Sequence, residues 1–256
     1  MHASDSGAIG AGRGDWVPKL HESESQCTVQ QEGSCILSAA PPPLPLARSR
    51  PMASIQPRRI TIKGGSSLLL RTALPEDAEA VVAHLRRMSA DAPWILRTPE
   101  ECDFPLEEER RLLNDWLFHE SAIALIAERD AEAPGGRPEV KAMAIFMTAS
   151  RRKIAHTVEV GMGADPDMRG MGIGRVMLEA LLDFAVTCPV ITKVMLKVYP
   201  ANVYAHRLYS AVGFVEEARI QRSALETDGT YHDMIQMAMY VKPGIAPEGY
   251  PTWPLS

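Results

Sequence analysis

One short segment of this sequence, Arg169-Gly170-Met171-Gly172-Ile173-Gly174, carries a glycine at every second position. The residues after it place apolar side chains at helical spacing, which predicts an amphipathic helix over residues 172–187. The apolar run before it, residues 154–162, predicts a strand. The glycines therefore form a turn that leads from a strand into a long helix.

Such a turn favours the binding of an anion. The first N–H groups of a helix have no acceptor within the helix, and the helix dipole places positive partial charge at the same end. Glycine has no Cβ to keep a phosphate away from these groups. We therefore interpret residues 164–174 as a phosphate-binding cradle, with a turn used only for tight packing as the alternative.

Two other kinds of glycine-rich phosphate site do not fit the spacing. A dinucleotide site of the type G-x-G-x-x-G opens the first strand-helix-strand unit of its fold and is followed by an acidic residue about 20 positions on. A nucleoside triphosphate loop ends in G-K-[ST]. The cradle meets neither requirement, since it lies late in the chain and Gly174 is followed by Arg175.

Composition argues against several other classes of protein. Of the 256 residues, 46% are apolar, which is enough for a core, and the net charge of −5 offers no basic excess for nucleic acid. No apolar run approaches the roughly 20 residues of a membrane span, and the first residues lack the apolar region of a signal peptide. The four cysteines are scattered without metal-ligand spacing, so we expect reduced thiols, no metal site and a cytoplasmic location.

Residues 1–67 differ in texture from the rest of the chain. They mix Gly, Ser, Pro and scattered charges, include the run Ala40-Pro41-Pro42-Pro43-Leu44-Pro45, and have neither helical nor strand periodicity. A segment of this kind cannot bury enough apolar surface to offset the entropy lost on ordering it. We expect a disordered extension, or sequence upstream of a start at Met52, with a proline-rich docking site as a third interpretation.

The folded domain is expected over residues 68–242, with a C-terminal tail at 243–256. Leu68-Leu69-Leu70-Arg71 predicts a first strand, and Leu74-Pro75-Glu76-Asp77 predicts the start of a first helix. The later pattern predicts a helix from 105 to about 119, strands at 122–127, 141–148 and 154–162, a helix at 172–187, a strand at 193–198, a helix at 202–212, and strands at 214–220 and 233–240.

Two motifs resemble those of the GNAT superfamily of acetyltransferases. Arg169-x-x-Gly172-x-Gly174 is similar to the family's Q/R-x-x-G-x-G/A acyl-CoA signature, and residues 202–214 resemble the family pattern N-x-x-A-x-x-x-Y-x-x-x-G-F. The resemblance covers about residues 68–242 and implies an α+β, three-layer fold with a mixed, mostly antiparallel sheet flanked by helices. Within the superfamily, the chain looks most like bacterial amino-acid and phosphinothricin-type acetyltransferases.

The resemblance implies that acetyl-CoA is the co-substrate. The residues that it implies as contacts of acetyl-CoA are Met162, Gly163, Ala164, Arg169, Gly170, Met171, Gly172, Ile173, Gly174, Arg175 and Asn202. Among them, a backbone N–H of residues 162–164 is expected to stabilise the thioester oxygen when it gains negative charge. Asn202 is expected to contact the pantetheine arm, to cap the helix that follows it, or to do both.

Two side chains are expected to take part in the reaction. Tyr209 matches the family tyrosine that gives a proton to the departing thiolate, and its alternative is packing against Phe214. Glu159 is the leading general base, because similar enzymes carry an acid on this strand. Its alternative is a structural ion pair or hydrogen-bond network, and a base could also be His156 or a chain of waters.

The amine that accepts the acetyl group is expected to be a small molecule such as an amino acid or a related amine. The first two helices and the last hairpin should line its site, where Trp94, Trp116, Tyr231 and Asp233 are available. A protein N-terminus or lysine is the alternative acceptor, since one fold serves both classes. A non-catalytic sensor of acyl-CoA is a further alternative, and the family resemblance allows a homodimer.

Overall fold

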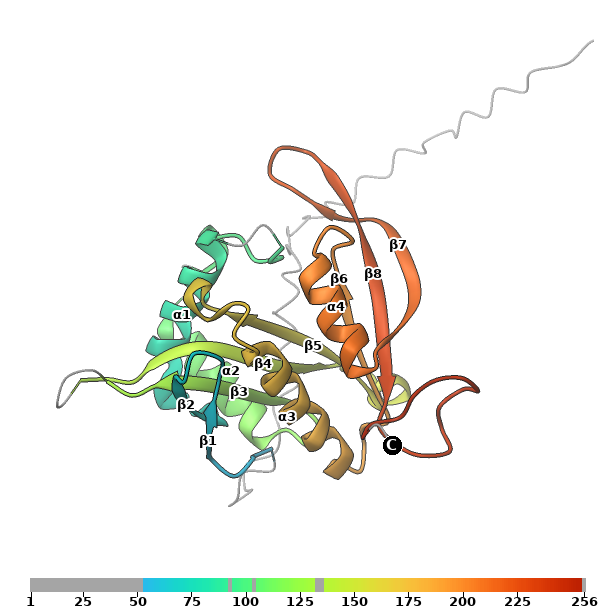
Figure 1. The fold of residues 1–256 in the computed structure, drawn as a ribbon, viewed down its shortest axis with the longest axis horizontal. Coiled ribbons are helices and arrows are strands. Elements are labelled where there is room, and N and C mark those ends of the chain that lie inside the picture. Colours follow the sequence, from blue (N-terminus) through green and yellow to red (C-terminus); the bar gives the residue numbers. More distant parts are fainter. Residues whose placement is uncertain (1–52, 92–93, 103–104, 132–135, 255–256) are drawn as a thin grey trace, which may run out of the picture. The chain divides into compact units, whose positions relative to one another are not determined.

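The computed structural model describes residues 53–91, 94–102, 105–131 and 136–254. Within them, eight strands form one sheet in the order β1-β2-β3-β4-β5-β6-β8-β7 (Figure 1). The strands are β1 Arg58–Thr61, β2 Ser67–Thr72, β3 Ile123–Arg129, β4 Glu139–Thr148, β5 Thr157–Ala164, β6 Lys193–Val198, β7 Val215–Leu225 and β8 Tyr231–Tyr240. The helices are α1 Ala78–Asp91, α2 Leu106–Phe118, α3 Ile173–Thr187 and α4 Val203–Val212.

The sheet consists of two antiparallel groups joined by one parallel pair. Strands β1 to β5 are antiparallel neighbours, and β6, β8 and β7 form the second group. β5 and β6 are parallel, and α3 forms the crossover between them. The mixed, mostly antiparallel sheet and its flanking helices confirm the expected α+β fold.

Side-chain alternation along the strands gives the sheet two buried faces. On β4, Ala144 and Phe146 belong to one apolar cluster, whereas Met143 and Ile145 belong to another. The first cluster also contains side chains of α3 and α4, and the second contains those of α1 and α2. Because successive residues of a strand point to opposite faces, the central strands are covered on both sides. The sheet is therefore the middle of three layers (Figure 1).

The domain begins earlier than the predicted boundary at residue 68. Strand β1 pairs antiparallel with β2, and Ala53 is fully buried in the cluster that packs on α3. Residues 53–67, which we predicted to belong to a disordered extension, are therefore part of the folded domain. Residues 1–52 of that extension lie outside the described residues. The strand escaped the sequence pattern because it lies at the edge of the sheet and Ile60 is its one buried residue.

Strand β5 starts later than predicted. Residues Arg152–Ile154 form a 3-10 turn, and the strand begins at Thr157. Ile154 suggested a strand because it is apolar, but half of its side chain is exposed. At the other end of the sheet, β7 and β8 extend beyond their predicted limits, because their mostly polar tips lack the alternation that predicts a strand.

The predicted C-terminal tail packs onto the domain as far as it is described. Thr252 forms a parallel bridge with Tyr240, and the Trp253 Nε1 donates a hydrogen bond to Asp183 Oδ1 of α3 at 3.1 Å. Tyr250 meets Tyr240 edge to face, with 5.6 Å between the ring centroids. The segment after β8 therefore closes over the end of α3.

The helices of the described residues are too short or too polar to cross a membrane. The longest of them, α3, has 15 residues, fewer than the roughly 20 that a span requires.

Candidate active site

Strands β5 and β6 pair along only part of their length. Their parallel register covers Thr157–Glu159 and Lys193–Met195, and no further pair joins them in the described residues (Figure 1). The other edge of β5 stays paired with β4 up to Ala164. One edge of residues 160–164 therefore carries N–H and C=O groups that an extended ligand with amide groups can bind.

The unpaired edge of β5 leads into the predicted cradle. Gly170 and Gly172 have φ values of 72° and 87°, in the left-handed region that favours glycine. Gly172 is the N-cap of α3, and open space surrounds the position where its Cβ would lie. The space beside the N-cap of α3 is therefore open, and the segment forms the predicted strand, turn and helix.

The cradle is held in place by neighbours on both sides. A Cβ at Gly174 would lie 3.1 Å from Leu208 Cδ2, so glycine allows α3 and α4 to approach closely. On the other side, the N–H of Lys63, in the turn between β1 and β2, donates to the Met171 carbonyl at 3.0 Å. The added strand β1 thus positions part of the cradle.

The polar side chains predicted around the cradle have different surroundings. Arg175 donates to Glu179 Oε1 at 3.1 Å and to the Ala211 carbonyl at 3.3 Å, which links α3 to the end of α4. Asn202 caps α4, since its Oδ1 accepts the Ala205 N–H at 3.1 Å. Arg169 ends the 3-10 turn that precedes Gly170. The capping role expected of Asn202 is confirmed.

A buried carboxylate joins the cradle to helix α1. Asp165, which follows β5 directly, is 1% exposed. Its Oδ1 lies 2.6 Å from Nδ1 of the fully buried His84, and its Oδ2 accepts from Arg87 Nε at 2.8 Å. Its backbone N–H donates to the carbonyl of Lys141 on β4 at 2.9 Å. The start of the cradle is therefore fixed to α1 and to β4 at once.

Two cationic side chains, Lys141 and Arg87, pair with Asp165 and with the carboxylates beside it. Lys141 Nζ lies 2.9 Å from a carboxylate oxygen of Glu139, 3.1 Å from one of Asp167 and 3.5 Å from one of Asp165. Arg87 also forms an ion pair with Asp165. Burial would raise the pKa of the Asp165 carboxyl, but the hydrogen bonds from His84 and Arg87 outweigh burial and lower it. Asp165 is therefore an anion in the folded protein near neutral pH.

Glu159 lies in an ion pair. Its two carboxylate oxygens accept from Lys197 Nζ at 3.1 and 3.0 Å. Glu159 is the last paired residue of β5, and Lys197 lies two residues beyond its pairing partner Met195 on β6. Both side chains are about a quarter exposed, at 23% for Glu159 and 27% for Lys197. The carboxylate thus reaches solvent at the point where the strands separate. His156, the other residue considered as base, is exposed before the start of β5.

Tyr209 is buried between α4 and the sheet. Its ring centroid lies 6.1 Å from that of Phe214, and burial raises the pKa of its hydroxyl to about 12. In the described residues the hydroxyl has no hydrogen-bond partner, although the ring belongs to the cluster that packs on α3. Packing against Phe214 is therefore present, and the hydroxyl remains protonated and available as a donor.

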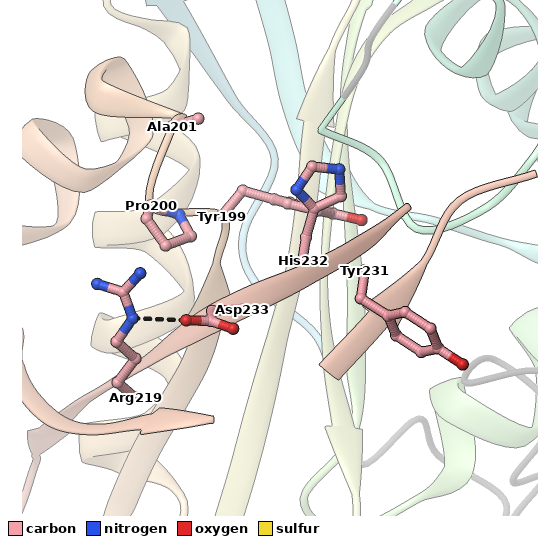
Figure 2. A pocket seen from close by; sticks show the side chains of 7 residues that line it. All are labelled: Tyr199, Pro200, Ala201, Arg219, Tyr231, His232 and Asp233. Atoms are coloured by element: carbon pink, nitrogen blue, oxygen red, sulfur yellow. Dashed lines mark hydrogen bonds and ion pairs between the residues drawn. The ribbon is translucent and has the colours of Figure 1, made fainter. Parts of the chain in front are cut away.

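A pocket of about 310 Å³ lies beside the end of β6, on the hairpin formed by β7 and β8 (Figure 2). It is lined by Tyr199, Pro200, Ala201, Arg219, Tyr231, His232 and Asp233. Trp94, from the segment between α1 and α2, lies 5.7 Å from the Tyr199 ring centroid. The segment between the first two helices and the last hairpin therefore meet here, whereas the helices α1 and α2, which we predicted to line the acceptor site, contribute no residue to the lining.

Of the four residues predicted to hold the acceptor, three lie at or beside this pocket. Tyr231 and Asp233 line it, and Trp94 lies against its wall. Trp116 does not join them, because it is 6% exposed in the core beneath α1 and α2. Tyr199 and His232 were not singled out by the sequence, since neither belongs to a motif and only the fold brings them together.

A buried carboxylate on helix α2 gives a prediction for pH. Glu109 of α2 is 2% exposed, and burial raises its pKa to about 7 despite the charge of Arg97. A pKa above the unfolded value means that this carboxyl costs stability as pH rises from about 4.5 to about 7. We expect Glu109→Gln to stabilise the fold at pH 8 by up to about 3 kcal/mol, with little gain at pH 4.5, in urea unfolding. An equal gain at both pH values would contradict this assignment.

The sequence was compared with protein-family models and with curated proteins. Residues 90–214 match the family model described as Acetyltransferase (GNAT) family. A 78-residue alignment is 38% identical to the [ribosomal protein bS18]-alanine N-acetyltransferase of Salmonella typhimurium. That alignment covers 30% of this chain and 51% of the relative, so the chain spans about half the length of the curated relative that it matches.

Solved structures share the fold. A GNAT acetyltransferase of Streptococcus pneumoniae is similar with a TM-score of 0.62 and 24% identity, over 68% of this chain and 99% of that one. A phosphinothricin acetyltransferase of Sinorhizobium meliloti, solved in complex with acetyl-CoA, is similar with a TM-score of 0.59 and 19% identity, over 73% and 96% of the two chains. At these sequence identities, the likeness shows a shared fold and nothing more.

Proposed function

The chain carries an acetyltransferase domain of the GNAT family, and on that premise we propose that it is an N-acetyltransferase. It transfers the acetyl group of acetyl-CoA, its co-substrate, to the primary amine of a small molecule such as an amino acid or a related amine. The amine attacks the thioester directly while both substrates are bound. The reaction products are an N-acetylated amine and free coenzyme A.

One observation carries this proposal: the unpaired edge of β5 leads directly into the open glycine turn at the start of α3. An acyl-CoA has an amide-containing arm that suits the first feature and a pyrophosphate that suits the second. The residues proposed to contact it are the backbone of 162–164 and 169–175, with Asn202 nearby. The relative from Sinorhizobium meliloti, whose structure contains acetyl-CoA, has the same fold.

The chemistry requires a neutral amine. An alkyl ammonium with a pKa of about 10.4 is almost fully protonated at pH 7, so freeing its lone pair costs about 4.6 kcal/mol. Glu159 is the proposed acceptor of this proton, directly or through water, and Lys197 holds its carboxylate in place. When the amine attacks, a backbone N–H of residues 162–164 stabilises the negative charge on the thioester oxygen.

Loss of the carboxylate should slow turnover and change its pH profile. We expect Glu159→Gln to lower kcat by about 100-fold, and the residual rate to rise about tenfold per pH unit towards the pKa of the acceptor. Glu217→Gln is the matched control, because Glu217 pairs with Lys193 at 2.6 Å in the same part of the sheet. Steady-state thiol release measures both variants. An equal loss in both would reduce Glu159 to a structural role.

The departing thiolate needs a proton, and Tyr209 is the proposed donor. We expect Tyr209→Phe to lower kcat by about 10- to 100-fold while the affinity for acetyl-CoA is kept, because the ring and its packing on Phe214 remain. Calorimetric titration gives the affinity and thiol release gives kcat. A variant with normal kcat would show that water can protonate the thiolate without this hydroxyl.

The proposed function itself is tested in two steps. The purified protein is first titrated with acetyl-CoA by calorimetry, and thiol release is then followed against a panel of amino acids, polyamines and peptides. Binding together with amine-dependent thiol release supports the proposal. Binding without release for any amine would favour a sensor of acyl-CoA, and absence of binding would remove the basis of the cofactor assignment.

A protein N-terminus is the second candidate acceptor. The observation in its favour is the 38% identity to an enzyme named for the alanine of ribosomal protein bS18, within the aligned 78 residues. A peptide that begins with alanine therefore belongs in the acceptor panel. A kcat/KM for that peptide well above the value for every small amine would favour this candidate.

A further inference from the structure

Three rings from separate parts of the chain meet beside the pocket. We call Trp94, Tyr199 and His232 the ring cluster. Tyr199 is 4% exposed, and its centroid lies 5.7 Å from that of Trp94 and 5.7 Å from that of His232, which it meets at 70°. Figure 2 shows the side chains of Tyr199 and His232 close to one another, while Tyr231 points away from them. Tyr199 and His232 line the pocket, and the partly exposed Trp94 lies against Tyr199.

Negative charge lies directly beside the ring cluster. The Tyr199 hydroxyl donates to Glu226 Oε1 at 3.3 Å, and His232 Nε2 lies 4.0 Å from the same oxygen. Burial, followed by the Glu226 charge, raises the pKa of Tyr199 to about 12, so its hydroxyl remains a donor. Asp228, two residues beyond Glu226 at the hairpin tip, accepts the Thr230 N–H at 2.8 Å.

These two carboxylates differ from their neighbours in lacking a strong cation. Three carboxylates on the nearby strands have a lysine or arginine partner, whereas Glu216 pairs with His206; the three pairs are Glu159 with Lys197, Glu217 with Lys193, and Asp233 with Arg219. Within the described residues, no lysine or arginine forms a salt bridge with Glu226 or Asp228. The guanidinium of Arg222 is placed instead over the Tyr231 ring, at 4.2 Å. The tip of the hairpin therefore has an excess of negative charge.

We propose that the ring cluster and Glu226 bind a second positive charge of the acceptor. A cation is attracted to aromatic faces and more strongly to a carboxylate beside them, and both are present here. An amino acid fits this arrangement poorly, because its own carboxylate would lie near Glu226. The acceptor class that fits is a small alkyl diamine, in which one nitrogen reacts and the other is held as an ammonium.

The distance along β6 sets the spacing between the two nitrogens. Tyr199 follows Lys197 by two residues, which is about 7 Å along a strand, and Lys197 pairs with Glu159. Two nitrogens joined by four methylene groups span on the order of 6 Å when extended. The length of an extended diamine is therefore similar to the backbone spacing between Lys197, which holds the proposed base, and Tyr199 of the ring cluster.

This inference rests on the proposed acetyltransferase activity, and a matched pair of acceptors tests it. Thiol release is measured with 1,4-diaminobutane and with butylamine, which has the same chain without the second charge. We expect kcat/KM for the diamine to exceed that for butylamine by about tenfold or more, and the preference to weaken with added salt. Equal values for the two amines would overturn the proposal.

Variants test whether the preference for the diamine depends on the ring cluster and Glu226 and not on other charges nearby. Glu226→Gln should remove most of the preference for the diamine, by lowering kcat/KM for the diamine much more than kcat/KM for butylamine. Glu216→Gln is the control, because it removes the same charge from β7 at a site where the carboxylate pairs with His206 of α4 at 2.6 Å. Trp94→Leu should also reduce the preference, since Trp94 is 38% exposed and its loss should leave the fold intact.

The outcomes distinguish failure of the inference from failure of the function. If other amines are acetylated but the diamine has no advantage, or if Glu226→Gln affects both amines equally, the second-charge site is wrong and the acetyltransferase remains. If acetyl-CoA binds but no amine releases thiol, the proposed function fails. Direct binding of 1,4-diaminobutane to the protein with coenzyme A, lost in Glu226→Gln, would then still support the site.

Discussion

Gly172→Glu is expected to abolish the binding of acetyl-CoA. The substitution places a carboxylate at the N-terminus of α3, where the pyrophosphate is proposed to lie, and two like charges in contact repel strongly. The φ value of 87° adds strain of about 1 kcal/mol for any residue other than glycine. Together these effects should weaken binding by at least about 100-fold in a calorimetric titration.

Gly244→Glu separates the charge in the cradle from the general effects of the substitution. Gly244 also has a positive φ, of 77°, and open space around its Cβ position, but it lies after β8 and away from the cradle. This variant carries the same new charge and a similar strain, so acetyl-CoA should bind to it normally. If Gly172→Glu bound acetyl-CoA as the wild type does, the cradle would not be the phosphate site.

Asp165→Ala is expected to produce the largest loss of stability. It would leave the buried His84 without its partner and Arg87 without its nearest carboxylate, whereas Lys141 would keep Glu139 and Asp167. Removal of one partner from a buried charge pair costs about 3–5 kcal/mol, and the cradle would lose its fixed starting point. Urea unfolding at pH 7 should detect the first effect, and a raised KM for acetyl-CoA the second.

The control for this variant is Asp167→Ala. Asp167 contacts Lys141 and Arg129 from a side chain that is 48% exposed, so its loss should cost about 1 kcal/mol or less. Because the folded-state pKa of Asp165 is lowered, its contribution exists above its unfolded pKa and disappears as pH falls through the lowered value. The stability difference from the wild type should therefore narrow in acid, and a difference independent of pH would argue against the ion network.

The sequence predicted those parts of the fold that depend on local patterns. Strand β6 was predicted at its observed limits because its burial alternates regularly, and α3 because its apolar stripe is continuous. Strand β1 was missed because its pairing with β2, and not its own composition, makes it a strand. An edge strand with one buried residue has too little alternation of apolar and polar side chains to be predicted from the sequence.

The candidate site likewise contains features that local sequence patterns predict and features that depend on the packing of distant segments. The cradle could be predicted because a turn that binds phosphate needs glycines at fixed positions within a few residues. His84 and Asp165 are 81 positions apart, and the ring cluster draws on residues from three distant segments. Their proximity depends on the packing of α1 and the hairpin against the sheet, which no local spacing encodes. The pairing of Glu159 with Lys197 depends likewise on the alignment of β5 with β6.

The contact between His84 and Asp165 also has a thermodynamic consequence. Helix α1 precedes Trp94, which lies beside the proposed acceptor site, and Asp165 begins the segment proposed to hold acetyl-CoA. The part of the free energy of acetyl-CoA binding that is coupled through this contact to α1 must appear equally as tighter binding of the acceptor. Linkage of this kind is reciprocal, so each substrate would prepare the protein for the other irrespective of which arrives first.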